Sequence, residues 1–250
     1  VIVLAQFSPK RTSGLIAPVL LAASGSAAAG ALSGTEAAFA MLLSTTAFLA
    51  FGRGWKRTLA GAHALLLLSR PEGTAFLLLL FTLVGLLRPR GEGARRAPCW
   101  KAFLLPALVA VAMVIVRRAL TGLWLSPFAA PLWEYDPARW RVGAEYLASF
   151  VFSSGFGLLF LTVVLSLCAG RSSAMGTRSL ALAGAWWAVV AFSGGDELPF
   201  WNALVPALPL FFLGVQECLR VWMDERESLA RVAWPLLFVS VSAAFLVSKV

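Results

Sequence analysis

Charge is scarce in this 250-residue chain: 13% of its residues are Asp, Glu, Lys or Arg, 60% are hydrophobic, and the mean hydropathy is +0.83. This composition cannot provide the surface of a soluble domain. The alternating segments of about ten residues that a membrane β-barrel requires are also missing. Instead, apolar runs of about 15 to 27 residues recur between short charged or Gly/Pro-containing breaks, close to the length that crosses about 30 Å of hydrocarbon. The sequence therefore predicts an all-α, polytopic transmembrane helical bundle.

Cysteine and histidine are also rare, with three cysteines and one histidine. An odd number of cysteines without metal-ligand spacing favours neither a disulfide framework nor a zinc site. In the topology derived below, Cys99, Cys168 and Cys218 fall at or near cytoplasmic helix ends, where reduced thiols are expected. His63 stands alone among leucines and alanines and is interpreted as a packed helix residue.

The chain opens inside an apolar stretch. Val1 is not a methionine, and "VIVLAQFS" has the character of the last two turns of a membrane helix. No charged segment followed by a cleavage site marks a signal peptide, so we expect the sequence to be a fragment of a longer protein. After this remnant at 1–9, the apolar pattern predicts nine membrane helices. They cover about 14–32, 35–51, 56–69, 73–88, 102–118, 143–169, 179–193, 200–219 and 232–248.

The connections between these helices alternate between two sides of the membrane if each helix crosses once. One side then carries 15 of the 21 basic residues and 5 acids, and the other carries 6 basic residues and 7 acids. Basic residues accumulate on the cytoplasmic side of membrane proteins, so the second side is predicted to face outward. The net charge of +9 is thus assigned to orientation and to contact with anionic membrane lipid, and nucleic acid binding is excluded.

Three outward connections have a serine followed three residues later by an acid and then by an apolar helix. They are Ser33 to Glu36 (SGTE), Ser69 to Glu72 (SRPE) and Ser193 to Asp196 (SGGD). One interpretation is a capping box, in which the serine oxygen accepts a backbone N–H and the acid reaches back to the cap residue. Pro71 fits an early position of such a helix. The other interpretation is that the acids line a site, and for Glu36 the two are equally supported.

Arg70 is harder to explain by capping. An arginine in the first helical turn opposes both the helix dipole and the excess of basic residues inside. An ionisable group costs about 2.5 to 3.5 kcal/mol at the centre of a membrane helix, so such groups face a cavity or a partner. Beside a helix N-terminus, Arg70 is a candidate anion-binding residue, and phosphate is the expected ligand. A salt bridge from Arg70 to a neighbouring loop acid remains equally compatible with the sequence.

The connection after residue 193 reads "FSGGDELPFWNALVPALPLFF" and combines a flexible turn, two carboxylates and two aromatic rings. These are Gly194, Gly195, Asp196, Glu197, Phe200 and Trp201. Such a set suits sugar binding, because carboxylates accept hydrogen bonds from hydroxyls and aromatic faces stack on C–H groups. The alternative is an interfacial aromatic belt with a helix-breaking loop, Pro206 and Pro209 kinking the next helix.

The longest outward segment, residues 119–142, is predicted to be a loop with amphipathic character that lies on the outer interface. The residues that indicate this are Trp124, Trp133, Tyr135, Arg139, Trp140 and Arg141. The segment either roofs a cavity or anchors the bundle.

Four stretches carry a resemblance to a known family. "SGTEAAFAMLL", "LLSRPEGTAFLLLL", "VRRALTGLWLSPF" and "GGDELPFWNALVPALPL" follow one another in the order found in bacterial polytopic glycosyltransferases of the GT-C type. Over residues 14–220 the chain resembles the mycobacterial terminal arabinofuranosyltransferase group and its uncharacterised bacterial relatives. The resemblance implies an inner-membrane enzyme that transfers a sugar from a polyprenyl-phosphate carrier to a glycan or lipid acceptor of the cell envelope, on the outer face.

The family's mechanism implies an outward cavity in which basic side chains hold the lipid phosphate and a carboxylate deprotonates the acceptor hydroxyl. The residues carried over to that cavity by position are Glu36, Arg70, Glu72 and Asp196. The further substrate-binding candidates are Arg117, Arg118, Glu197, Trp201 and Asn202. Glu36 and Asp196 are candidates to support catalysis, whereas the principal base is expected upstream of Val1, because the family's catalytic aspartates lie in the first outward loop. A divalent cation is a candidate cofactor without a recognisable site.

The chain also departs from the family pattern. Ser126 and Pro127 stand where relatives have Pro-Asn, and Asn202 stands where they tend to have arginine, so the sugar is not identified. Two other functions fit an outward cavity lined by charged helix ends: a transporter or lipid flippase, and a non-catalytic membrane subunit of an envelope complex. Inverted repeats would favour the transporter, and no repetition between the halves is apparent.

Overall fold

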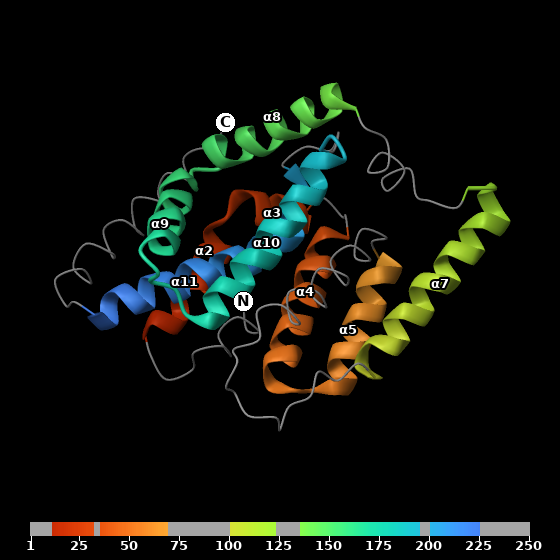
Figure 1. Cartoon of the computed structure of the whole chain (residues 1–250), viewed down its shortest axis with the longest axis horizontal. Helices are drawn as coiled ribbons and strands as arrows, with labels where there is room; N and C mark the ends of the chain where they lie inside the picture. The colour runs from red at the N-terminus through yellow and green to blue at the C-terminus, as the bar shows by residue number, and fades with distance from the viewer. Residues whose placement is uncertain (1–11, 33–35, 70–100, 124–135, 196–200, 226–250) are drawn as a thin grey trace.

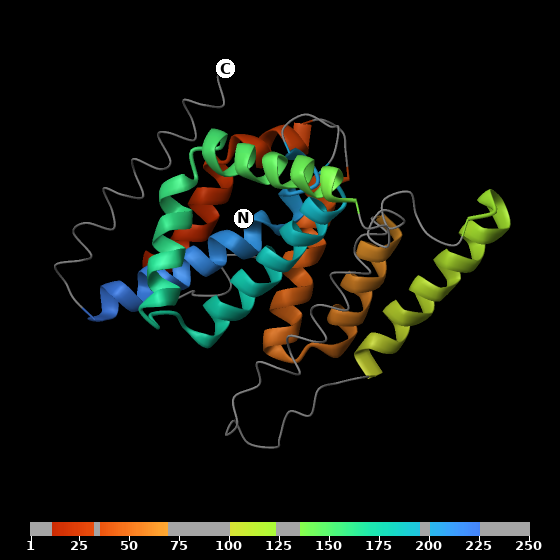
Figure 2. The ribbon, with the colours of Figure 1, turned by 45° about the horizontal axis from the view of Figure 1, so that its top comes forward.

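A computed structural model of the chain describes residues 12–32, 36–69, 101–123, 136–195 and 201–225. The regular structure in these ranges is entirely helical, as the composition predicts. Four helices mark one end of the bundle: α4 (Ala37–Arg53) begins there, and α5 (Lys56–Ser69), α7 (Lys101–Thr121) and α10 (Ala174–Phe192) end there, as two views of the ribbon agree (Figures 1 and 2). Helix α8 lies across this end, which we call the α8 end.

Helices α4 (Ala37–Arg53) and α5 (Lys56–Ser69) form an antiparallel hairpin. The turn between them requires a left-handed residue, which Gly54 supplies with φ of 72°. The Gly54 N–H donates to the Phe51 carbonyl at 3.2 Å and the Trp55 N–H to the Ala50 carbonyl at 2.8 Å. These bonds satisfy carbonyls that would otherwise be left open at the end of α4.

Helix α7 (Lys101–Thr121) packs against α5 at the edge of the molecule (Figure 1). His63 of α5 is fully buried, and its ring lies 5.9 Å from that of Phe103. The interpretation of His63 as a packed helix residue is therefore confirmed.

Helices α8 (Pro137–Ser153) and α9 (Gly157–Cys168) meet at an angle of 103°. Asp136 caps α8, accepting from the N–H groups of Ala138 and Arg139 at 3.0 and 3.4 Å, and Pro137 occupies the first helical position. Both features are typical helix starts. Gly155, with φ of 74°, takes the left-handed conformation that ends α8 and allows the sharp bend.

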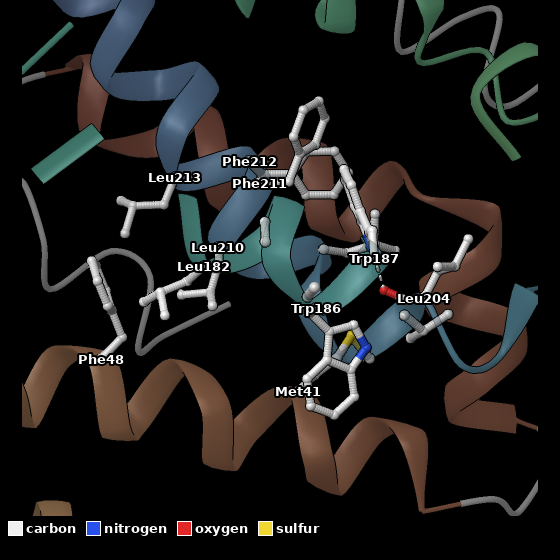
Figure 3. Close-up of a cluster of buried hydrophobic side chains, with 14 of the residues drawn as sticks. Met41, Phe48, Leu182, Trp186, Trp187, Leu204, Leu210, Phe211, Phe212 and Leu213 are labelled. Carbon is white, nitrogen blue, oxygen red and sulfur yellow. Dashed lines mark hydrogen bonds between the residues drawn. The ribbon is translucent and has the colours of Figure 1, made fainter. Parts of the chain in front are cut away.

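Helices α10 (Ala174–Phe192) and α11 (Leu208–Glu225) cross in the centre of the fold, and α11 also contacts α2, α4 and α9. An irregular segment, residues 201–207, leads into α11 through the short 3₁₀ helix η4 (Val205–Ala207) and is almost wholly buried. Trp186 and Trp187 of α10 reach this segment from the cluster of aromatic and aliphatic side chains around Phe211 (Figure 3).

Three side-chain donors satisfy the carbonyls of that buried segment. The indole N–H groups of Trp186 and Trp187 donate to the Ala203 and Leu204 carbonyls at 2.7 and 3.0 Å. The Ser44 hydroxyl of α4 donates to the Pro206 carbonyl at 2.9 Å. Non-helical backbone inside a membrane protein is tolerated only where the protein itself supplies such partners, so α4 and α10 together hold the irregular start of α11 in place.

Replacing Trp187 by phenylalanine should therefore destabilise the protein, because the ring volume shrinks and the Leu204 carbonyl loses one of its two donors, keeping the Ala207 N–H at 3.2 Å. Loss of one hydrogen bond costs about 0.5 to 1.5 kcal/mol. Thermal unfolding in detergent measures the change. Trp55→Phe is the matched control, since Trp55 is 46% exposed at the α4–α5 turn and should unfold like wild type. Equal melting temperatures for the two variants would contradict this account.

Several predicted boundaries are wrong, for local reasons. The single helix expected over 14–32 is a 3₁₀ turn (Thr12–Leu15) followed by α2 (Ile16–Ala23) and α3 (Gly25–Leu32). Ser24 separates the two helices: its backbone is extended and its hydroxyl oxygen accepts from the Ala27 N–H at 3.2 Å, as an N-cap does.

The helix expected over 143–169 is the bent pair α8 and α9. The predicted loop 119–142 is helical at both ends, where α7 continues to Thr121 and α8 begins at Pro137. The expected helix over 200–219 begins only after η4. The predicted helices 73–88 and 232–248 and the remnant 1–9 lie outside the described residues.

Two helices in the described ranges are long and apolar enough to cross a membrane, Phe103–Thr121 and Val205–Met223. The α8–α9 pair makes a third if it is counted as one broken span. The first is 11% buried in the protein and the second 83%, so α11 is a central helix and α7 a peripheral one. These helices are compatible with location in a membrane.

Candidate functional site at the α8 end

The residues predicted from the sequence to line an outward cavity fall into two groups. Arg70, Glu72, Asp196 and Glu197 lie outside the described residues. The described ones occur at helix ends or the turn into α11: Glu36 immediately before α4, Arg117 and Arg118 near the C-terminal end of α7, and Trp201 and Asn202 before η4. The N-terminal end of α4 and the C-terminal ends of α7 and α10 all lie at the α8 end (Figure 2).

Two serines of the repeated motif, Ser69 and Ser193, lie at the ends of the helices that precede them. Ser69 is the last residue of α5, and its hydroxyl donates to the Leu66 carbonyl at 3.0 Å. Ser193 follows α10, and its hydroxyl donates to the Val190 carbonyl at 2.8 Å. Both serines thus close the helix that precedes them. Glu36 takes the cap position of α4 without a side-chain cap bond, so it is not the third helical residue that a capping box needs. The capping-box interpretation is therefore wrong for Glu36, whereas Glu72 and Asp196 of the other two motifs lie outside the described residues.

Helix α8 approaches the end of α10 so closely that only glycine fits at the contact. A Cβ on Gly143 would lie 1.7 Å from the carbonyl oxygen of Ala191. Gly194 and Gly195, with φ of 95° and 84°, form the turn after α10. A Cβ on Gly194 would meet the Arg139 stem, and one on Gly195 would meet the Tyr146 ring, each at 2.8 Å. The Gly-Gly turn predicted from the sequence therefore leaves the space in which the α8 side chains pack.

Trp201 adopts a left-handed backbone conformation, with φ of 53°, the only positive φ of a non-glycine residue in the described ranges. This conformation costs a bulky residue about 1 to 2 kcal/mol. Contacts with α8 offset it. The indole N–H donates to the Ser149 hydroxyl at 2.9 Å, and the ring meets that of Phe150 edge to face at 5.8 Å. The side chain is half-buried, so part of its surface is accessible.

Asn202 is buried, with 3% of its surface exposed. It follows Trp201 directly and precedes the carbonyls that Trp186 and Trp187 bind. Its position on the clamped segment therefore makes it a fixed polar group beside a half-exposed aromatic ring.

Arg117 and Arg118 do not lie near Trp201 and Asn202. Helix α7 is separated from α10 by α4 and α5 (Figure 1). The Arg118 guanidinium binds the Gly122 carbonyl of its own helix end. Nη1 of Arg117 is buried without a hydrogen-bond partner among the described residues. The two arginines thus share the α8 end with Trp201 and Asn202 but lie on a different edge of it.

Three residues of α8 that the sequence did not single out as a site face the same region: Arg139, Tyr146 and Ser149. Their spacing of seven and three residues places them on one side of a helix. This signal was present in the sequence. It was missed because residues up to 142 were assigned to a loop and those from 143 onward to a membrane helix.

A second polar cluster lies at the far end of the bundle. Glu217 of α11 is 4% exposed. It accepts from the Ser173 hydroxyl at 2.7 Å and from Nη2 of Arg220 at 2.9 Å. Ser173 in turn caps α10, accepting from the Gly176 N–H at 3.0 Å. This cluster joins α10 to α11 and has a structural role. In the described parts of the chain, no three His, Cys, Asp or Glu side chains gather where they could hold a metal ion.

Comparison of the chain with protein-family models, with curated proteins and with solved structures finds no match. The functional argument therefore depends on the residues of this chain.

Proposed function

We propose that the protein is a membrane glycosyltransferase of the GT-C type. It would move a sugar from a polyprenyl-phosphate carrier to a glycan or lipid acceptor of the cell envelope, at the outer face of the cytoplasmic membrane. The observation that carries the proposal is that Glu36, which precedes α4, and Trp201, which is hydrogen-bonded to α8, lie at the same end of the bundle.

The groups at this end suit that chemistry. A half-exposed indole offers a sugar ring an apolar face. Glu36 is exposed at the start of α4, where a carboxylate can accept a proton from a hydroxyl. In the sequence, Arg70 follows α5 and Asp196 follows the Gly-Gly turn. Both connections leave from the α8 end.

The distribution of basic residues supports an outward-facing α8 end. Seven described basic residues lie at the other end of the bundle, on the α4–α5 turn, at the start of α7 or α10, or late in α11: Arg53, Lys56, Arg57, Lys101, Arg171, Arg178 and Arg220. Four lie at the α8 end: Arg117, Arg118, Arg139 and Arg141. By the rule that basic residues stay in the cytoplasm, the end with seven is cytoplasmic. A lipid-linked donor would then enter from the outer leaflet, and α7, whose apolar surface is exposed, would face the acyl chains.

A transporter is the rival function, and the broken helices α2–α3 and α8–α9 favour it, because discontinuous helices often form transport sites. Detergent solution separates the two functions, since it has no second compartment. A transferase forms a glycosylated product there from a polyprenyl-phosphate sugar, whereas a transporter binds the donor and forms none.

The test is transfer from a panel of radiolabelled polyprenyl-phosphate sugars, arabinofuranose among them, by the full-length protein in detergent, with Glu36→Gln as the diagnostic variant. The substitution keeps the shape of an exposed side chain and removes its charge, so the melting temperature should not change. Loss of a supporting carboxylate should lower kcat by about 100-fold. Glu145→Gln is the control, because Glu145 is an exposed α8 glutamate paired with Arg141 at 2.9 Å and should retain wild-type turnover. Absence of product from the wild type would reject the proposed function.

A further inference from the structure

We propose that Ser149 of α8 is a positioning residue that holds the Trp201 ring as a platform for a saccharide. The inference rests on the proposed function and adds two things to it: a binding surface for the sugar, and the residue that sets its orientation.

The Ser149 hydroxyl is oriented by its own helix. It donates to the Tyr146 carbonyl one turn earlier at 2.7 Å. With its one proton committed there, its oxygen presents lone pairs to the incoming indole N–H of Trp201 at 2.9 Å. Ser149 and Trp201 are 52 residues apart in the chain, so the bond ties α8 to the irregular segment that leads into α11.

The ring of Trp201 is fixed at two further points. Phe150 meets it edge to face at 5.8 Å, an arrangement that favours one ring orientation. The left-handed backbone at Trp201 sets the direction in which the side chain leaves the chain. Strain of this kind persists only where the surroundings determine the conformation. Here the surroundings are α8 on one side and the segment clamped by Trp186 and Trp187 on the other.

A fixed and half-exposed indole can serve a saccharide as a stacking surface. The C–H groups of a sugar ring carry partial positive charge and stack on the electron-rich aromatic face. A ring held in one orientation costs less entropy on binding than a mobile one. Ser149 thus contributes to affinity without touching the sugar.

Kinetics of the full-length protein test this role. Ser149→Ala removes the acceptor, and Trp201→Phe removes the indole donor while keeping an aromatic face. Each should raise KM for the radiolabelled donor by about fivefold with kcat within a factor of two, the size expected for one hydrogen bond. The double variant should be no worse than either single one, because both remove the same bond. Ser149→Thr, which keeps the hydroxyl, should restore wild-type KM.

Ser153→Ala is the matched control, an exposed serine on the same helix that should leave KM unchanged. The indole ¹⁵N–¹H signal of Trp201, identified by its loss in Trp201→Phe, should shift in Ser149→Ala and stay in Ser149→Thr. An active wild type whose KM values are unchanged by Ser149→Ala, or whose two substitutions act additively, overturns the inference and leaves the proposed function standing. An inactive wild type rejects both.

Discussion

Gly143→Ala is expected to destabilise the protein by about 2 kcal/mol, even though alanine is the better helix former. Two effects of opposite sign compete. Replacing a helical glycine gains about 1 kcal/mol in helix propensity. The new methyl carbon would lie 1.7 Å from the Ala191 carbonyl oxygen and 2.6 Å from its carbon, which are backbone atoms of α10 that no rotamer change can move. Overpacking of this kind costs about 3 kcal/mol, so the clash wins and α8 must shift away from α10.

Gly184→Ala provides the control with the opposite sign. Gly184 lies in α10, and a Cβ there would meet nothing within 4 Å, so the propensity gain should appear as a small stabilisation. In detergent, the melting temperature of Gly143→Ala should fall by roughly 5 °C. Trypsin should also cleave α8 faster after Arg139 and Arg141, because a displaced helix opens more often. A Gly143→Ala protein as stable and as resistant as wild type would refute the close contact between α8 and α10.

Gly143→Ala also tests whether the position of α8 affects substrate binding. If α8 forms one wall of the site, its displacement removes the Ser149–Trp201 bond, and KM should rise in Gly143→Ala at least as much as in Ser149→Ala. Gly184→Ala should leave KM at the wild-type value.

The sequence predicted best those elements whose pattern is local. The α5 helix was predicted at 56–69 and occurs at Lys56–Ser69, because a left-handed glycine and a basic turn define its start and an apolar run defines its body. The helical class followed from composition alone. The break at Ser24 and the bend at Gly155 were missed, because the apolar character continues through both positions and only the backbone conformation changes.

The candidate site was predicted in part for a similar reason. Trp201 and Asn202 stand next to a Gly-Gly turn and two prolines, an irregularity that is visible in the sequence. Ser149 has no such neighbours, and its importance arises from a contact with a residue 52 positions away. Arg117 and Arg118 were grouped with the site by sidedness, which assigns an end of the bundle but not a position on that end. Lateral placement depends on the order in which helices pack, and a hydropathy pattern does not contain that order.

Arg220→Met is expected to be the other strongly destabilising substitution, by about 2 to 3 kcal/mol. Glu217 is 5% exposed at its side chain and Arg220 29%, and both Nε and Nη2 of Arg220 donate to the same carboxylate oxygen of Glu217, at 3.3 and 2.9 Å. Methionine keeps much of the arginine stem and removes the charge. Glu217 would then be buried with the Ser173 hydroxyl as its remaining donor among those described here. An uncompensated buried charge costs about 3 to 5 kcal/mol, less here because Arg220 is partly exposed.

The double variant Glu217→Gln with Arg220→Met decides whether charge or packing is responsible. Glutamine still accepts from Ser173 and so preserves the cap of α10, but it needs no cation. The double variant should therefore unfold at a higher temperature than Arg220→Met alone, because replacing both members of a buried pair costs far less than removing one. Arg57→Met, at an exposed position near the α4–α5 turn, should unfold like wild type. If the double variant is no more stable than Arg220→Met, the loss comes from the packing of the Arg220 stem. The Glu217 carboxylate would then need no cation at this end of α11.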